Sequence, residues 1–236
     1  MALKRSELYT LNASISTTEY SIPNGGTTLQ NITTPVLLTG LLDAEPVSDG
    51  DCFRVRVKEK IVSGGTQRVI LDFLICNDQQ SSPLYSFGPF LLLHGWDVTI
   101  VKVSGTDRTL TGRIEVSTGS NISELYGRSN TSVTNSGYSI INNSTTPASS
   151  ASPAIIQAIC HDRTNMVKAD EFEIAVLEKA AAASTQRTMF SRRCHDVQVV
   201  APFVTPLLAV RNGWDVVLDR IAGADRNWDM SIRGMT

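Results

Sequence analysis

The sequence repeats itself, and this internal repeat limits the possible folds more than any other feature. The segment Gly95-Trp96-Asp97-Val98 returns as Gly213-Trp214-Asp215-Val216, and residues 95–116 align without a gap on residues 213–234. A repeat of this length indicates one structural unit used twice. We therefore expect two domains, residues 1–118 and residues 119–236.

Each copy of the repeat combines two alternating apolar runs with a short turn between them. In the first copy Trp96, Val98 and Ile100 occupy every second position, which is typical of a strand with one buried face. Residues 105–108 and 223–226 both have the pattern Gly-x-Asp-Arg, in which glycine and aspartate favour a tight turn. We expect each domain to end in a β-hairpin that is anchored by a buried tryptophan.

The alternation slips at one place in each copy. After Ile100 and after Leu218 the apolar residues move to the other parity, at Val101 and at Ile221. An extra residue in one strand of an antiparallel pair produces such a slip. We therefore expect a β-bulge near the turn in both copies.

The remaining segments also alternate. Each copy contains about eight strand candidates, a number and spacing typical of β-sandwiches and jelly rolls. Residues 53–60 and 172–179, for example, alternate apolar with polar side chains, which indicates one face in water. Residues 177–184 are rich in alanine, but the repeat aligns them with a strand and a Gly-Gly loop, so we expect no helix there. The predicted fold is all-β, with two tandem antiparallel β-sandwich, jelly-roll-like domains.

Composition argues against several classes of partner. Apolar residues make up 42% of the chain and charged residues 19%, as in folded proteins. A net charge of −2 supplies no positive field for nucleic acid and no basic patch for a membrane surface. The N-terminal residues lack the apolar stretch of a signal peptide, and no segment is long enough to span a membrane. We expect synthesis in a cytoplasm, with neither nucleic acid nor membrane as a partner.

The four cysteines, Cys52, Cys76, Cys160 and Cys194, show no Cys-x-x-Cys spacing and lie mostly in strand-like runs. A chain made in a reducing compartment usually keeps its cysteines as thiols. The prediction is therefore four free, buried thiols.

No segment has the pattern of a known catalytic or metal site. His94, His161 and His195 have no metal-ligand spacing, and neither Gly-x-Ser-x-Gly nor Ser-x-x-Lys occurs. We expect no catalytic residue, no metal site and no cofactor, so the chain is predicted not to be an enzyme.

The repeat contains two acidic pairs, Asp97 with Asp107 and Asp215 with Asp225. Such pairs could serve acid–base chemistry or bind calcium. However, an aspartate that follows a core tryptophan is expected to point out of the strand, and one in a turn is expected to bond the turn itself. We predict that Trp96, Trp214, Asp107 and Asp225 are structural anchors.

Two further features leave alternatives open. Trp96 and Trp214 could stack on a sugar ring, although a tryptophan at the head of an alternating strand is more often part of the core. The triplet Thr-Gln-Arg occurs in both copies, with Gln67-Arg68 in the first and Gln186-Arg187 in the second. Long polar side chains have no use in a core, so these residues should pin a loop or contact a neighbouring protein.

Two segments of the first copy carry a resemblance to a known group of proteins. Residues 55–68 (VRVKEKIVSGGTQR) and residues 95–116 (GWDVTIVKVSGTDRTLTGRIEV) resemble a class of small proteins encoded by tailed bacteriophages. In that class a strand, a glycine loop and Gln-Arg precede a Gly-Trp-Asp-Val-Thr hairpin with Gly-Thr-Asp-Arg at its turn. Such proteins have about the length of one copy, so the resemblance implies a tandem duplication. The second copy departs from the pattern at residues 188–193, where its strand is more polar.

The resemblance implies a non-enzymatic virion component built from β-sandwich modules. Within that class we favour a capsid decoration or cement protein over a tail, collar or fibre-attachment component. The implied partners are other virion proteins, such as major capsid or tail proteins, and further copies of the chain. From a different class, the alternative is a module that binds host glycans.

Overall fold

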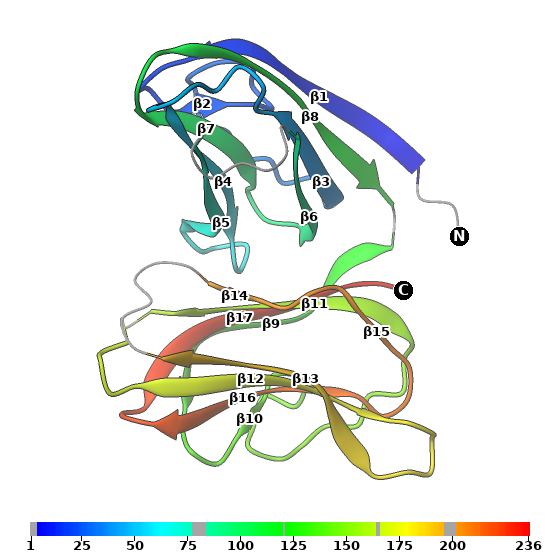
Figure 1. Cartoon of the computed structure of the whole chain (residues 1–236). Coiled ribbons are helices and arrows are strands. Elements are labelled where there is room, and N and C mark those ends of the chain that lie inside the picture. Colours follow the sequence, from blue (N-terminus) through cyan, green and yellow to red (C-terminus); the bar gives the residue numbers. More distant parts are fainter. Residues whose placement is uncertain (1–3, 77–83, 120, 164–165, 196–201) are drawn as a thin grey trace. The chain divides into compact units, whose positions relative to one another are not determined.

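The computed structural model describes residues 4–76, 84–119, 121–163, 166–195 and 202–236. These residues contain only strands, turns and irregular segments, and no helix among them could cross a membrane. The chain forms two compact units, Met1–Ile122 and Ser123–Thr236 (Figure 1).

The first unit is a sandwich of two four-stranded antiparallel sheets. One sheet has the strand order β1-β8-β3-β6 and the other has the order β2-β7-β4-β5. The strands are β1 (Lys4–Ile15), β2 (Tyr20–Ser21), β3 (Val36–Asp43), β4 (Cys52–Lys60), β5 (Gln67–Cys76), β6 (Leu84–Leu92), β7 (Asp97–Ser104) and β8 (Arg108–Thr118).

The second unit repeats this arrangement. One sheet has the order β14-β11-β17-β9, with β15 also paired to β11, and the other has the order β10-β16-β12-β13. The strands are β9 (Ile122–Val133), β10 (Tyr138–Ser139), β11 (Ala154–Asp162), β12 (Glu171–Lys179), β13 (Gln186–His195), β14 (Phe203–Val204), β15 (Leu208–Val210), β16 (Asp215–Ala222) and β17 (Arg226–Met235).

Both units have the topology of a jelly roll. In the first unit the first, eighth, third and sixth strands form one sheet, and the second, seventh, fourth and fifth form the other. In the second unit the short strands β14 and β15 together replace the sixth strand, since both pair with β11. This order is the jelly-roll order. The predicted fold class, two antiparallel β-sandwiches of jelly-roll type, is therefore confirmed.

The core of each unit lies between its two sheets and follows the alternation of the strands. In β4 the residues Phe53, Val55 and Val57 are fully buried, and the residues between them are only partly buried. The strand β12 buries Phe172, Ile174 and Val176 in the same way. Residues 177–184 continue β12 to Lys179 and then enter a turn, as the repeat predicts, rather than a helix.

The turn at residues 105–107 does not close a β-hairpin. The strand β7 pairs with β2 and β4, whereas β8 pairs with β1 and β3 in the opposite sheet. The turn between β16 and β17 likewise joins the two sheets of the second unit. The hairpin prediction is wrong because an alternating pattern reports only that each strand buries one face. Two strands that face each other across a core have the same pattern as two strands that lie side by side.

The predicted bulges are present. The register of β7 against β4 shifts where Cys52 pairs with Ser104 and Phe53 pairs with Lys102, so that Val103 is the extra residue. In the second unit the register of β16 against β12 shifts at Ile221. Both bulges lie immediately before the turn that crosses between the sheets.

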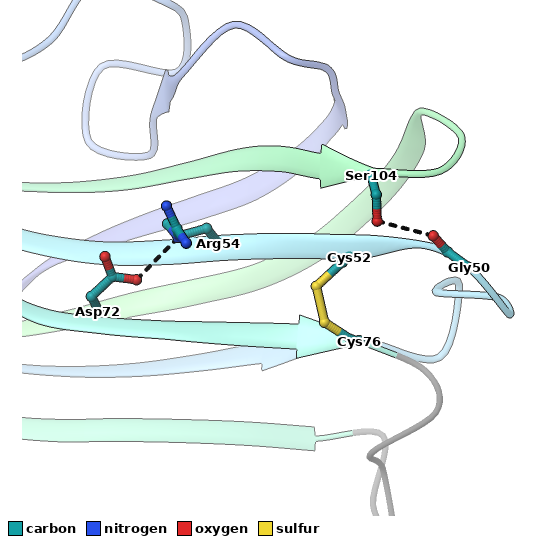
Figure 2. The surroundings of a disulfide bond; sticks show 6 residues. All are labelled: Gly50, Cys52, Arg54, Asp72, Cys76 and Ser104. Atoms are coloured by element: carbon teal, nitrogen blue, oxygen red, sulfur yellow. Dashed lines mark hydrogen bonds and ion pairs between the residues drawn. A yellow bond between two sulfur atoms is a disulfide. The ribbon is translucent and has the colours of Figure 1, made fainter.

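The cysteines differ from the prediction. Cys52 and Cys76 lie directly opposite each other on β4 and β5, with their Cα atoms 4.3 Å apart, and form a disulfide (Figure 2). The prediction of four free thiols is wrong for this pair, because their proximity depends on the β4–β5 register and not on their spacing in the sequence. Cys160 and Cys194 are free thiols buried in the core of the second unit.

Candidate functional site

The repeated tryptophans lie inside the two cores. Trp96 is fully buried and its Nε1–H donates to the carbonyl of Thr34 at 3.0 Å. Trp214 is 1% exposed and donates in the same way to Ser152 at 2.8 Å. Each also meets the edge of a tyrosine ring at about 6 Å between centroids, as aromatic pairs prefer. Neither tryptophan has an open ring face, so the interpretation of this pair as a sugar-stacking platform is wrong.

Asp97 and Asp215, which follow these tryptophans, are buried rather than exposed. The carboxylate of Asp97 accepts bonds from the Ser21 hydroxyl at 2.8 Å and from the Gln30 N–H at 2.8 Å. Asp215 accepts equivalent bonds at 2.9 Å and 2.7 Å. Burial raises the pKa of both carboxyl groups, although these hydrogen bonds act in the opposite direction. The expectation that these side chains point into solvent is wrong, because the segment after β2 or β10 folds over them.

Gln67 and Gln186 bind loops of their own unit. The Gln67 amide nitrogen donates to the carbonyl of Gly95 at 2.7 Å and to that of Gln30 at 3.1 Å. The Gln186 nitrogen donates to Gly213 at 2.7 Å and to Ala148 at 3.0 Å. The sequence left two roles open for these glutamines, namely holding a loop or contacting a neighbouring protein. The hydrogen bonds of both amides show that they hold loops.

The arginines of the same triplets are placed differently. Arg68 is half-buried and Arg187 is exposed. Arg187 lies beside Thr188 and Met189 at the end of the β12–β13 pair, where these residues line a shallow hollow. A contact of these two arginines with another protein stays a prediction.

The turns that cross between the sheets are held by two aspartates that sequence reasoning missed. Asp51 accepts bonds from the N–H of Thr106 at 2.7 Å and of Ser48 at 3.0 Å, and from Arg108 Nε at 2.6 Å. The two N–H groups and the Arg108 guanidinium lower the pKa of Asp51 to about 2. The repeated pattern Asp-x-Phe, at residues 51–53 and 170–172, was the available signal for these residues.

Asp170 holds the corresponding turn of the second unit. It accepts from the N–H of Ala224 at 3.0 Å, from the N–H of Val167 at 2.7 Å and from Arg226 Nε at 2.8 Å. Burial alone would raise the pKa of Asp170, but these donors lower it. The same interactions therefore close both crossing turns.

The predicted anchors Asp107 and Asp225 are exposed residues of these turns. Asp107 forms an ion pair with Lys102, and Asp225 lies 2.7 Å from Arg220 Nη1. Exposed pairs of this kind contribute little to stability, on the order of 1 kcal/mol or less. Asp51 and Asp170 hold the turns by hydrogen bonds, as was predicted for Asp107 and Asp225.

A third repeated carboxylate closes the loop that precedes each tryptophan. Glu59 is fully buried, and its Oε1 accepts from the N–H groups of Leu93 at 2.5 Å and His94 at 3.0 Å. Glu178 accepts from Arg211 at 2.6 Å and Asn212 at 3.1 Å. The repeated Glu-Lys pairs at residues 59–60 and 178–179 were the signal for this contact.

The outward faces of β4 and β12, by contrast, are not repeated. At three corresponding positions β4 carries Arg54, Arg56 and Lys58, whereas β12 carries Glu173, Ala175 and Leu177. In the first unit Glu19 joins this face, 2.7 Å from Lys58 Nζ and 3.4 Å from Arg56 Nη1. Burial would raise the pKa of Glu19, but its bonds from Lys58 and Thr99 and the two nearby cations lower it.

The second unit has a different charge arrangement on the same face. Arg193 of β13 pairs with Glu171 at 3.1 Å and with Glu173 at 3.8 Å. The two units therefore share their internal polar contacts and differ in the charges that they present outward. In the part of the chain that the structure describes, no group of three His, Cys, Asp or Glu side chains is placed to hold a metal ion.

No protein-family model matches the chain, and no curated protein matches it. Among solved structures, the chain is similar to the exported protein XepA of PBSX, with 8% identity, 98% of this chain and 87% of that chain covered, and a TM-score of 0.33. It is also similar to the N-terminal CBM22-1–CBM22-2 tandem domain of Xyn10C from Paenibacillus barcinonensis, with 10% identity, 100% and 89% coverage and a TM-score of 0.26.

A third similar structure is that of the Macrobrachium rosenbergii nodavirus, with 10% identity, 99% of both chains covered and a TM-score of 0.25. Scores and identities this low carry no information about function. The fold described above rests on the strand order of the chain itself.

Proposed function

We propose that the chain is a non-enzymatic structural protein of a bacteriophage virion, and that it decorates the assembled capsid shell as a cement protein. The starting point is the resemblance of residues 55–68 and 95–116 to segments of small proteins from tailed bacteriophages. The proposal also includes further copies of the chain and the major capsid protein as partners, and the virion as the location.

The proposal rests on a comparison of two corresponding strands, β4 and β12, whose inward faces agree and whose outward faces differ. The alternate residues of β4 and β12 agree closely: Phe53, Val55, Val57 and Glu59 correspond to Phe172, Ile174, Val176 and Glu178. The outward residues between them change from cationic in β4 to acidic and apolar in β12. Two frameworks with the same interior and different outward faces suit a protein that binds unlike neighbours.

The repeated polar side chains support the same view. The carboxylates of Asp51, Asp97 and Glu59 and the amide of Gln67 all bind loops of their own unit. They fix the jelly roll, and jelly rolls occur in viral capsid proteins as well as in lectins. A decoration protein needs such a framework, because many weak contacts on a repeating shell add up to firm attachment.

Mass spectrometry of purified virions tests the proposal. We expect the protein in virions, at a copy number comparable with that of the major capsid protein. A tail, collar or fibre-attachment component would instead occur in few copies. Absence from virions would contradict both structural roles.

Addition of the purified protein to shells that lack it tests the contact itself. We expect saturable binding, with interfaces that bury together more than about 1,000 Å², the size of a specific interface. Exchange of the outward charges, in the pair of variants Arg54→Glu and Glu173→Lys, should alter binding without loss of folding. If neither variant changes binding to shells, the outward faces of β4 and β12 are not the contact surfaces.

A further inference from the structure

The disulfide of the first unit joins the edge strand β5 to its neighbour β4. Among the residues that the structure describes, β5 is hydrogen-bonded to β4 alone in the sheet β2-β7-β4-β5. Cys52 and Cys76 form the last pair of the β4–β5 register, at the end of β5. At such an end a strand with one neighbour opens most easily, because few contacts hold it. Figure 2 shows the disulfide at this end of β5, where it ties the edge strand to β4.

In the second unit the corresponding end of the edge strand is held by an ion pair. Its edge strand β13 is bonded to β12, and the last pair of that register is Glu171 with His195. The carboxylate of Glu171 lies 3.1 Å from Arg193 Nη1 and 3.6 Å from His195 Nδ1. Two equivalent edge strands are therefore fastened at equivalent pairs, one by a covalent bond and one by ionic and polar contacts.

We propose that Cys52 and Cys76 are the redox-responsive site of this protein: oxidation fastens the end of β5, and reduction releases it, while β13 does not respond. This proposal does not depend on the virion role. It predicts that the first unit acquires its final edge strand only after the chain meets an oxidant. The second unit has its final edge strand in either environment.

The surroundings of the four cysteines explain why only one pair responds. Cys52 and Cys76 are partly exposed on the outward face of the sheet, within reach of a small thiol or disulfide in solution. Cys160 is 0% exposed and Cys194 is 1% exposed. Burial raises the pKa of the Cys160 thiol, and raises that of Cys194 to about 12. The thiolate is the reactive form, so these two thiols stay inert.

The chemistry needs one oxidant, a small-molecule disulfide such as oxidised glutathione. The thiolate of one cysteine attacks a sulfur of glutathione disulfide and releases one glutathione thiol, which leaves a mixed disulfide on the protein. The second cysteine attacks the protein sulfur of this intermediate and releases the second glutathione. The Cys52–Cys76 bond forms, two electrons pass to the small disulfide, and the two protons of the cysteines are taken up by the released thiolates.

Two measurements on the full chain test the proposal. After incubation with oxidised glutathione, alkylation under denaturing conditions should label two of the four cysteines, and after reduction it should label all four. Amide hydrogen exchange at residues 71–76 should be on the order of tenfold slower in the oxidised protein than in the reduced protein. Exchange at residues 190–195 should be the same in both.

Two variants supply the controls. The double variant Cys52→Ser, Cys76→Ser should lose the redox dependence of exchange at residues 71–76. The double variant Glu171→Cys, His195→Cys should acquire a redox dependence of exchange at residues 190–195. This second variant tests the proposal even if the serine variant fails to fold. The proposal is overturned if four thiols remain after oxidation, or if exchange at residues 71–76 is the same in both forms of the natural protein. It also fails if the new pair oxidises without slowing exchange in β13.

Discussion

The Nε atom of Arg108 lies 2.6 Å from Oδ2 of Asp51. Asp51 immediately precedes β4 in one sheet, and Arg108 is the first residue of β8 in the other. In the second unit Arg226 Nη2 lies 2.6 Å from Oδ2 of Asp170. Each unit therefore has an ion pair that links its two sheets at the crossing turn.

Acid should weaken the first unit through Asp51. Its donors lower its pKa in the folded protein to about 2, whereas an aspartate in an unfolded chain titrates near about 4. The stabilisation is present above pH ~4 and is lost as the pH falls through ~2. Urea unfolding of the wild type and of Asp51→Asn should therefore differ at pH 5, and the difference should shrink between pH ~4 and ~2. As a control, Asp107→Asn should change the free energy of unfolding by less than about 0.5 kcal/mol, both at pH 5 and in the acid range. A difference that grows on acidification would contradict this assignment.

Asp97 should show the opposite pH dependence. Burial raises its pKa above the value of an unfolded chain, so its stabilisation is fully present below pH ~4 and is lost as the pH rises through the raised value. Asp97→Asn keeps one acceptor oxygen and replaces the other by an NH2 group, so the side chain can no longer accept from both Ser21 and Gln30, and the lost bond should cost about 1–3 kcal/mol. We expect that cost to be larger at pH 4 than at pH 7, as measured by urea unfolding at both values. The prediction is wrong if the variant is more severely destabilised at pH 7.

The two aspartates illustrate what the sequence could predict about the fold. The repeat, the strands, the bulges and the sandwich class follow from periodicity, because period-two burial is a local property of the chain. The pairing of strands is not local, so the sequence pattern does not distinguish the crossing turn from a hairpin. The burial of Asp97 is not predictable for the same reason, because the segment that covers it follows β2 and is distant in sequence.

Loss of either repeated tryptophan should destabilise only its own unit. Trp96→Ala should lower the free energy of unfolding of the first unit by about 3–5 kcal/mol, since a large buried aromatic side chain leaves a cavity. Trp214→Ala should do the same to the second unit. Hydrogen exchange of core amides in each unit provides the measurement, and each variant is the control for the other. Equal loss of protection in both units from one substitution would show that the units do not fold independently.

Gln67 should contribute more to stability than its partial exposure suggests. Gln67→Ala leaves the carbonyls of Gly95 and Gln30 without the amide that they share, and should cost about 1–3 kcal/mol. Arg187→Ala is the matched control on an exposed side chain, and should change stability by less than about 0.5 kcal/mol. Thermal unfolding of both variants distinguishes them. Similar effects of the two substitutions would argue against the loop-pinning role of Gln67.

The polar residues that hold the loops were only partly predictable. Gln67 and Gln186 stood out because an identical triplet recurs in both copies. Asp51 and Glu59 recur as well, but inside strands or turns where acidic residues are common, and their partners lie in loops remote from them in sequence. The Cys52–Cys76 bond does not follow from the sequence, because the two cysteines meet only through the register of β4 against β5.

The crossing turn between β7 and β8 bears on how each unit loses its structure. One end of that turn belongs to each sheet. Asp51, which precedes β4 in one sheet, binds Thr106 within the turn and Arg108 at the start of β8 in the other sheet, so we expect the two sheets of the first unit to separate together. The same holds for the turn between β16 and β17 with Asp170. Each jelly roll should therefore melt as one cooperative block, without a state in which a single sheet survives. A calorimetric scan of the chain should then resolve into no more than two all-or-none transitions.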